Sequence, residues 1–407
     1  MGIFSTILNF IGDTALLWIP IILGIIFWYT FRAYQRQIFV NEKIQYVLLE
    51  INIPKDVFKS PQAMELVIDV LSHLGGGAMA WQDRFWFGAV LMPSSLEIIS
   101  IEGSIYFFIR ANHQIADLVK STIYSQYPNA EVNEVDDYTR YVPDYNVHQD
   151  SWDLYGVDFK LAQDDFLPIK TYVDYGLDKA VGTLDEEQKI DPITPLLEYL
   201  GTLRSGEQIW IQFIVRSDQF SDWRKRGKAK IEDIMGRGRE ILDDEPFQSV
   251  KITHGEQEQI KAIEKGLSKH AFETVIRAVY IAKKENFSKV PIGFFKNPVF
   301  KPFNSLYLNS IFRNLDTTTV DWIWQDITGL RTPALKRRFF NDYVNRAAFY
   351  EPFWKYLNFL WYKRNPPMIF TSEELATLFH IPGRVSETSN LERIDAKKSE
   401  APTNLPI

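Results

Sequence analysis

The stretch SLEIISIEGSIYFFIRA, residues 95–111, decides the fold. Two runs rich in isoleucine and aromatic residues flank Glu102-Gly103, and this pattern predicts two antiparallel strands joined by a tight turn. The run IQYVLLEINIP (44–54) lies upstream of the hairpin and predicts another strand, which ends at its proline. The hairpin therefore has at least one further strand with which it can form a sheet.

Two amphipathic helices are predicted on either side of the hairpin. In PQAMELVIDVLSHLGGG (61–77) the apolar residues are spaced for one helix face, and the glycines end the helix. HQIADLVKSTIYSQYP (113–128) predicts a second helix, and AEVNEVDDY (130–138) a last strand. The order β-α-β-β-α-β is that of a split βαβ, or ferredoxin-like, unit, which we assign to residues 44–140.

An aromatic insertion at 78–93, containing AWQDRFWFGAVLMP, does not belong to that pattern. Its tryptophans are compatible with a contact surface and also with a loop packed on the sheet. Aromatic residues are more often buried against their own chain, which favours the loop.

A second α/β unit is predicted at 150–290. Its strands include PIKTYVDY (168–175), EQIWIQFIVRS (207–217) and AFETVIRAVYIAKKE (271–285). Residues 291–370 are expected to be helical or irregular. The predicted fold is therefore α+β: an N-terminal transmembrane helix, tandem ferredoxin-like units and a helical or irregular C-terminal part.

The N-terminal stretch ALLWIPIILGIIFWYTF (15–31) has no charge until Arg32 and predicts a transmembrane helix. A cleaved signal peptide is the alternative, but residues 1–14 contain no lysine or arginine and the apolar run ends in bulky aromatic residues. Aromatic belts and basic flanks mark the boundaries of an uncleaved anchor. The expected anchor residues are Trp18, Pro20, Trp28, Tyr29, Arg32 and Arg36.

The basic residues after the span, Arg32, Arg36 and Lys43, predict a single-pass protein of the inner membrane whose C-terminal body is cytoplasmic. Residues 1–14 would then lie along the opposite interface.

A dense basic cluster, DWRKRGKAK (222–230), precedes GRGRE (236–240) and an acidic run. A flexible charged excursion that joins two elements explains this pattern most simply. A contact with lipid or DNA phosphates is the alternative. The residues for that contact would be Arg224, Lys225, Arg226, Lys228, Lys230, Arg237 and Arg239.

No motif for catalysis is found in the sequence. The chain has no cysteine, and its six histidines do not have metal-ligand spacing. GTLRSGEQ (201–208) has the glycine spacing of a phosphate-binding loop, but Glu207 and Gln208 replace the lysine and hydroxyl residue. We therefore expect no enzyme activity and no cofactor. The net charge of −7 also argues against a protein that coats nucleic acid along its whole length.

The segment TSEELATLFHIPG (371–383) contains a capping-box pattern and predicts a short helix that docks a partner. The composition of residues 384–407 predicts an extended linker. The side chains expected to dock the partner are Glu374, Leu375, Leu378, Phe379, His380 and Pro382.

MIFTSEELATLFHIPG (368–383), followed by KKSEAPTNLP (397–406), resembles the segment that precedes the motor domain of HerA/FtsK-type ATPases. These include membrane-anchored bacterial proteins of conjugation and type IV secretion. The hairpin stretch and FLPIKTYVDYGL (166–177) are similar to the uncharacterised N-terminal region of the same proteins. In that family the Asn-Leu-Pro stretch continues into an ATPase with a phosphate-binding loop, whereas this sequence stops at Ile407.

The resemblance implies a membrane-anchored, non-catalytic assembly module of a DNA or protein translocation machine. Its expected partners are the membrane, a hexameric HerA/FtsK-type ATPase on another chain, further copies of itself, and DNA indirectly. The alternative is a membrane-bound nucleic-acid-binding protein that uses the basic cluster and the net basic C-terminal third.

Overall fold

The computed structural model describes two compact units of this chain. Unit 1 comprises Met1–Gln45, Gly76–Leu91 and Phe349–Arg364, and unit 2 comprises Tyr46–Gly75, Met92–Ala348 and Asn365–Ile407. The structure describes residues 2–40, 44–53, 59–72, 81–86, 88–142, 151–178, 190–218, 221–244, 252–296, 298–317, 329–349 and 366–382.

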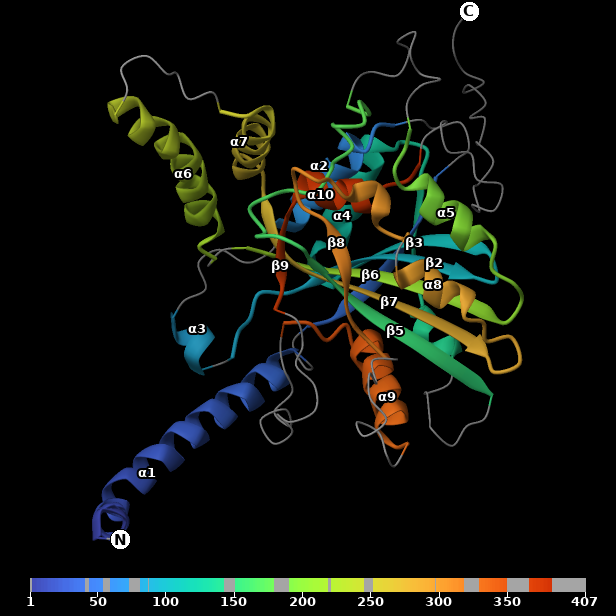
Figure 1. Cartoon of the computed structure of the whole chain (residues 1–407). Helices are drawn as coiled ribbons and strands as arrows, with labels where there is room; N and C mark the ends of the chain where they lie inside the picture. Colours follow the sequence, from blue (N-terminus) through green and yellow to red (C-terminus); the bar gives the residue numbers. More distant parts are fainter. Residues whose placement is uncertain are drawn as a thin grey trace, which may run out of the picture. The chain divides into compact units, whose positions relative to one another are not determined.

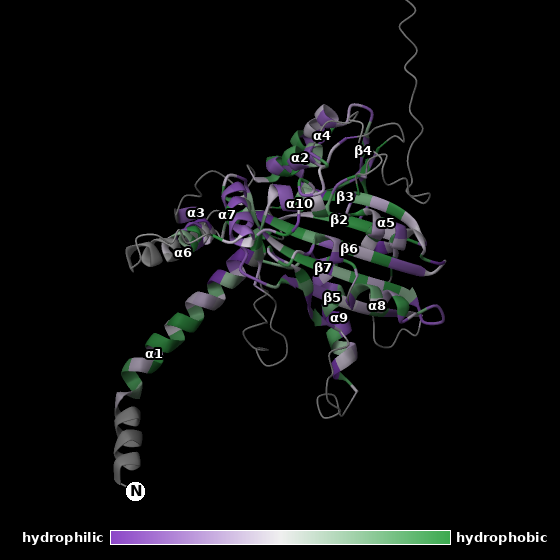
Figure 2. Cartoon of the chain, turned by 45° about the horizontal axis from the view of Figure 1, so that its top comes forward, coloured by the Kyte–Doolittle hydropathy of each residue, from purple (hydrophilic) through white to green (hydrophobic). Residues whose placement is uncertain are grey.

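Unit 1 contains α1 (Gly2–Ile38) and α3 (Trp81–Trp86), which contact each other (Figure 1). The apolar residues of α1 from position 15 to position 29 form the green stretch of this helix in Figure 2 and are largely exposed. The 23-residue stretch Thr14–Arg36 is long and apolar enough to cross a membrane, a property that anchors and signal sequences share. The helix begins at Gly2, so the expected separate segment 1–14 is instead continuous with the apolar helix.

In the part of unit 2 that the structure describes, the strands form one sheet of nine. Their bounds are β1 (Tyr46–Asn52), β2 (Ser94–Ile101), β3 (Ser104–Asn112), β4 (Glu131–Val135), β5 (Trp152–Leu161), β6 (Glu207–Ser217), β7 (Ala271–Lys283), β8 (Ile311–Asp316) and β9 (Met368–Thr371). The helices are α2 (Gln62–Ser72), α4 (His113–Gln126), α5 (Thr194–Gly201), α6 (Trp223–Asp244), α7 (His254–Leu267), α8 (Val290–Lys296), α9 (Arg331–Val344) and α10 (Ser372–Leu378), with 3-10 turns η2 (Tyr138–Tyr141) and η4 (Lys301–Phe303).

The strand order is β4-β1-β3-β2-β6-β7-β5-β8, and β9 pairs with the beginning of β7. Every described pairing is antiparallel. The predicted hairpin is confirmed: Ile101 pairs with Ser104, and Glu102 and Gly103 have the positive φ angles of a tight turn. Strands β2 and β6 pair along their length, from Ser94↔Val215 to Ile101↔Gln208, and join the two halves into one sheet.

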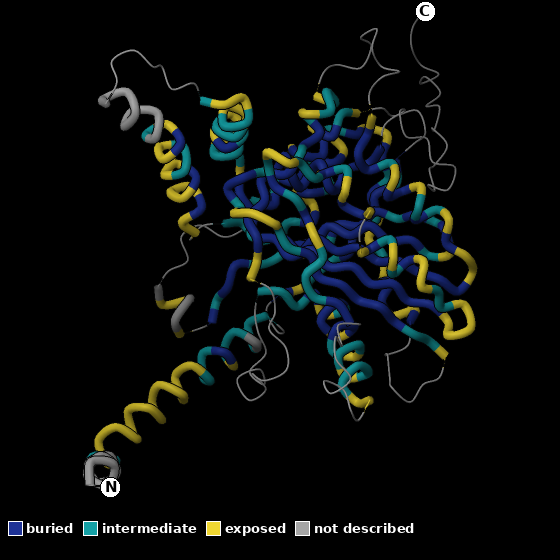
Figure 3. The backbone as a smooth tube through the Cα atoms, viewed as in Figure 1, coloured by how far each residue is buried: buried dark blue, intermediate teal, exposed yellow. Residues whose placement is uncertain are grey.

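Alternation along the strands gives the sheet two buried faces (Figure 3). In β1, Leu49 and Ile51 contribute to one core, whereas Leu48 contributes to the other. The first core is formed with α2, α4, α5, α8 and α10, and the second with η2 and α9. Because helices cover both faces, the central strands β2 and β6 are buried along almost their whole length.

The prediction of an α+β protein with an apolar N-terminal helix is confirmed, and so is the order β-α-β-β-α-β in the first half. Residues 168–175 form turns and not the predicted strand, since Pro168 lacks an N–H and Asp174 accepts a hydrogen bond from Thr171 N. Residues 291–370, expected to be helical or irregular, also contain β8 and the beginning of β9. Both strands are too short for a clear period of two.

Candidate functional site

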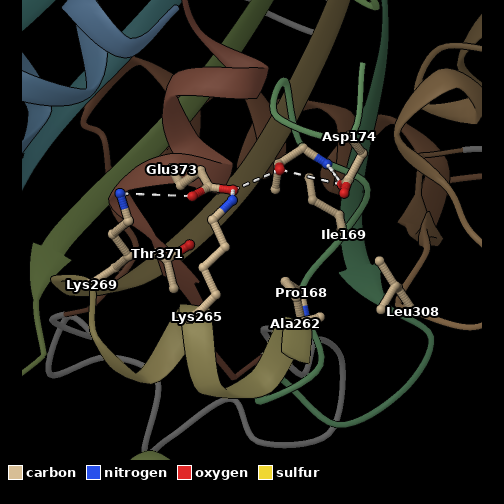
Figure 4. A pocket seen from close by; sticks show the side chains of 11 residues that line it. Pro168, Ile169, Asp174, Ala262, Lys265, Lys269, Leu308, Thr371 and Glu373 are labelled. Atoms are coloured by element: carbon tan, nitrogen blue, oxygen red, sulfur yellow. Dashed lines mark hydrogen bonds and ion pairs between the residues drawn. The ribbon is translucent and has the colours of Figure 1, made fainter. Parts of the chain in front are cut away.

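The C-terminal segment 366–382 is built into unit 2 and borders a small cavity of about 50 Å³ (Figure 4). β9 pairs with β7, and α10 follows it at once. Thr371 and Glu374 form the predicted capping box: Thr371 Oγ1 accepts from Glu374 N, while the Glu374 carboxylate accepts from Thr371 N at 2.8 Å. The cavity lies between α10, α7 and the turns at 168–174.

Lys265 in the last turn of α7 and Lys269, which lies two residues beyond the end of that helix, reach the carboxylates beside this cavity. Lys265 Nζ donates to Glu373 Oε1 at 2.6 Å, and Lys269 Nζ donates to Glu65 Oε1 at 2.6 Å. Lys269 Nζ also lies 3.7 Å from Glu373 Oε2. The last turn of α7 and the residues that follow it therefore present both lysines to α10 (Figure 4). We call Glu65, Lys265, Lys269 and Glu373 the α7–α10 ion cluster.

Three hydroxyl groups also donate hydrogen bonds to these carboxylates. Tyr172 OH donates to Glu65 Oε2 at 2.6 Å, and Ser372 Oγ donates to Glu65 Oε1 at 3.3 Å. Thr171 Oγ1 donates to Glu373 Oε1 at 2.7 Å. Because the carboxylates of Glu65 and Glu373 are almost fully buried, these bonds offset the loss of hydration that an ion in the interior suffers.

The surroundings of the cluster shift several pKa values. Burial would lower the pKa of Lys269, but the hydrogen bond to Glu65 and the charges of Glu65 and Glu373 outweigh it and raise that pKa. Burial raises the pKa of the nearby Asp69 carboxyl. Lys269 is therefore a permanent cation at neutral pH, which suits a structural ion pair and not a general base.

The cavity beside the α7–α10 ion cluster is small. A cavity of about 50 Å³ holds a few water molecules at most and is too small for an ordinary cofactor. Among the described residues, no group of three or more His, Asp or Glu side chains is placed to hold a metal ion. The α7–α10 ion cluster thus fixes the C-terminal segment to α2 and α7.

A second polar contact holds the end of α10. His380 Nε2 lies 3.1 Å from both Asp191 oxygens, and His380 Nδ1 lies 2.9 Å from Ala376 O. Two backbone N–H groups of the segment 168–174 also bind side chains of α10. Ile169 N donates to Glu374 and Tyr172 N donates to Thr377 Oγ1. None of these contacts could be predicted from the sequence, because Asp191 and His380 are 189 residues apart.

The expectation that α10 offers a surface to a partner is corrected by its position. Phe379 packs edge-on against Phe107 of β3 at 5.7 Å between ring centroids. Every predicted docking residue lies inside the chain's own core: Glu374, Leu375, Leu378, Phe379, His380 and Pro382. The apolar stripe in the sequence marks burial in this sheet, and a stripe by itself does not specify which surface it covers. The predicted linker 384–407 lies outside the described residues.

The basic cluster at 222–230 is helical, which corrects the expectation of a flexible excursion. Trp223, Gly227 and Ile234 form the buried stripe of α6, and Trp223 Nε1 donates to Asp165 O at 2.9 Å. The charged residues obscured this i, i+4 spacing in the sequence. The remaining positions of this helix place basic side chains outward.

These basic residues do not form one continuous patch. Arg226 pairs with Asp165 at 2.7 Å beside a cavity of about 230 Å³, and Lys230 lies 3.5 Å from Asp233. Arg224, Lys225 and Lys228 are exposed and fall on a neighbouring arc of the helix. The side chains of Arg237 and Arg239 lie outside the described set.

A further buried ion cluster lies on the opposite face of the sheet. Arg346 donates to Glu97 at 3.1 and 3.2 Å and pairs with Asp137, while Tyr138 OH donates to Glu97 at 2.7 Å. Arg346 has a φ of 47°, an unusual angle for a residue with a side chain. The Arg346 contacts keep the pKa of Glu97 low despite its burial. This cluster fastens the residues after α9 to β2.

Comparison with known proteins gives a family and no activity. No curated protein matches the chain. A family model matches residues 89–393, which is well over half of the chain and includes the hairpin, α10 and three members of the α7–α10 ion cluster, Lys265, Lys269 and Glu373. The chain therefore belongs to the family described as a domain of unknown function, DUF8128.

Proposed function

We propose that this protein is a non-catalytic assembly module, held at the inner membrane by α1, that positions a HerA/FtsK-type ATPase carried by another chain. The machine would move DNA or protein, as in conjugation and type IV secretion. The exposed apolar stretch Thr14–Arg36 supports the anchor, and the basic residues Arg32 and Arg36 support a cytoplasmic C-terminal body.

The observation that carries the proposal is the attachment of segment 366–382. β9 pairs with β7 over four residues, Ala271↔Thr371 to Thr274↔Met368, and α10 is buried along its whole length. The α7–α10 ion cluster and the His380–Asp191 pair fix both ends of α10. The residues after 382 therefore start from a fixed point of the sheet. A module that positions a separate ATPase through these residues needs such a fixed starting point.

We also propose that the sheet contains two ferredoxin-like halves. Numbered along the chain within each half, the strand order is 4-1-3-2 for β1–β4 and again 4-1-3-2 for β5–β8, with the two second strands, β2 and β6, paired at the seam. The outer strands β4 and β8 form the ends of that order. Edge strands can pair with another chain, which makes them the natural contacts for a homo-oligomer.

Co-purification from membranes tests the proposed role. The full chain is expressed with a candidate HerA/FtsK-type ATPase, solubilised in mild detergent and captured through one partner. Deletion of 384–407 should abolish capture while the variant keeps its fold by circular dichroism. Deletion of 371–407 is unsuitable, because it removes the buried α10 and unfolds the module. Capture that is unaffected by loss of 384–407 would contradict docking through this segment, and absence of capture by the full chain would contradict the proposal.

Nucleic-acid binding remains the second candidate, because Lys225 and Lys228 are exposed on α6 and Lys225 lies 3.8 Å from Asp222, a distance longer than a hydrogen bond. It predicts affinity that falls steeply with salt. Lys225→Glu/Lys228→Glu should abolish that binding, whereas Asp222→Asn on the same turn should not. Binding that is undetectable at low salt would eliminate this candidate.

A further inference from the structure

The aromatic insertion packs on the C-terminal part of α1 within unit 1. The Trp28 and Trp86 rings meet edge to face at 6.2 Å between centroids and 88°. Ala89 N donates to Asp83 O at 3.0 Å and closes the turn that follows α3. A short turn therefore lies directly against the apolar helix.

Gly88 shows how close this approach is. Its φ is +66°, and a Cβ at this position would lie 2.7 Å from Arg36 N and 2.7 Å from the Gln35 carbonyl carbon. Only glycine permits both the conformation and the contact with the α1 backbone. The segment therefore contacts α1 at two places: Trp86 contacts Trp28, and Gly88 contacts the backbone of residues 35–36.

These two places lie at the end of the candidate membrane span, which runs from Thr14 to Arg36. At about 1.5 Å per residue, Trp28 lies roughly 12 Å before Arg36 along the helix axis. Trp28 also lies four residues before Arg32, the first charge after the apolar run, and tryptophan is enriched where hydrocarbon meets headgroups because its ring is apolar and its N–H is polar. Trp86 is 53% exposed beside the partly exposed Trp28.

We propose that residues 81–90 are a second membrane-contacting element, which inserts Trp86 into the lipid headgroup layer on the side of Arg36. The partner of this surface is the phospholipid headgroup layer. The reason is that α3 packs against α1 and the exposed Trp86 ring lies beside Trp28 of the aromatic belt. Gln82 and Asp83 are exposed on the same short helix and lie four and three residues before Trp86, so they border the same helix face. The inference rests on the proposed membrane anchorage of α1.

The chain contains no cysteine, so a nitroxide can be placed at one position at a time. Full-length Trp86→Cys, Gln82→Cys, Ile22→Cys and Asp136→Cys variants are labelled and reconstituted into phosphatidylcholine–phosphatidylglycerol vesicles. Power-saturation EPR then compares collisions with oxygen, which partitions into lipid, and with a nickel chelate, which stays in water. Ile22 belongs to the apolar span, and Asp136 is 83% exposed in unit 2.

We expect Ile22→Cys to favour oxygen strongly and Asp136→Cys to favour nickel. Trp86→Cys and Gln82→Cys, which share one face of α3, should lie between them, with at least a several-fold preference for oxygen over Asp136→Cys. A Trp86→Cys label as accessible to nickel as the Asp136→Cys label, with Ile22→Cys protected, overturns the inference and leaves the anchor intact. Accessibility of Ile22→Cys to nickel overturns the anchor and with it the proposed function. Gly88→Ala in the Trp86→Cys background should shift the label toward water, because it displaces the turn from α1.

Discussion

His380 is held by acceptors at both ring nitrogens. The Ala376 carbonyl faces Nδ1 and the Asp191 carboxylate faces Nε2, so both nitrogens must carry a proton for both bonds to form. Burial lowers the pKa of His380, but the charge of Asp191 and its hydrogen bond outweigh it and leave this pKa above its usual value. His380 is therefore a buried cation paired with a buried anion.

His380→Ala should lower the free energy of unfolding by about 3–5 kcal/mol at pH 6, because it leaves Asp191 buried without its partner. The folded pKa lies above the unfolded value, so this contribution is fully present below about pH 6.5 and is lost as pH rises through the folded pKa. Denaturant titrations of the full chain in detergent at several pH values measure it. An equal effect of His380→Ala at pH 6 and pH 9 would contradict the ion pair.

Glu374 adds a second pH dependence of the same sign. Burial raises its pKa to about 7, although N–H groups of Thr371 and Ile169 favour the carboxylate. The folded state therefore binds a proton that the unfolded state releases above pH 4.5, and stability falls as pH rises from about 4.5 to 7.

Glu374→Gln should flatten the stability profile over that range, since the amide does not titrate. Hydrogen exchange of peptides covering 368–380 at pH 5 and pH 8 provides the measurement. His380→Ala is the comparison, because it leaves Glu374 in place. A profile that keeps its slope after Glu374→Gln would show that another group titrates.

At the scale of elements, α10 depends to different extents on Lys265 of α7 and on Lys269, which follows that helix. The Lys269 side chain is 31% exposed and pairs with Glu65, which is 5% exposed. The Lys265 side chain is 43% exposed, and its partner Glu373 also accepts a bond from Thr171 and lies near Lys269. Removing Lys269 thus deprives a buried carboxylate of its closest cation, whereas removing Lys265 leaves Glu373 with other partners.

Lys269→Gln should destabilise the attachment of α10 by about 1–3 kcal/mol, since Glu65 keeps its charge and loses its cation. Lys265→Gln is the matched control four residues earlier in the chain and should cost less than about 1 kcal/mol. Hydrogen exchange in β9 and α10 reports both. Equal effects of the two substitutions would show that Glu65 is not the more dependent carboxylate.

At the scale of the molecule, the seam between β2 and β6 makes unit 2 one cooperative sheet. Ile98 of β2 pairs with Ile211 of β6, and both are completely buried. Two independent domains would respond separately to a change in either one, but a shared core transmits it to both halves.

Ile98→Ala should lower stability by about 2–5 kcal/mol, because it opens a cavity in this core. Hydrogen exchange should show the same loss of protection in β1 and in β5, which lie on opposite sides of the seam. Leu66→Ala on α2 is the control, since Leu66 is 47% exposed and its truncation should change stability by about 0.5 kcal/mol or less. Loss of protection confined to β1 would contradict a single cooperative unit.

The elements that could be predicted from the sequence are those whose pattern is local. The Glu102-Gly103 turn, the capping box at Thr371 and the apolar run before Arg32 each depend on residues within a few positions of one another. Such patterns determine the α+β class, the apolar N-terminal helix and the first half of the sheet.

Tertiary structure alone decided what these elements contact. Lys269 meets Glu65 across 204 residues of sequence, and α10 is buried against the sheet although its stripe equally suits a docking helix. The charged residues of α6 masked its helical period in the sequence. In the structure Trp223 packs in one apolar cluster with Ile263 of α7. A periodic pattern specifies a face but not its neighbour, because the choice of neighbour is made by packing between distant segments.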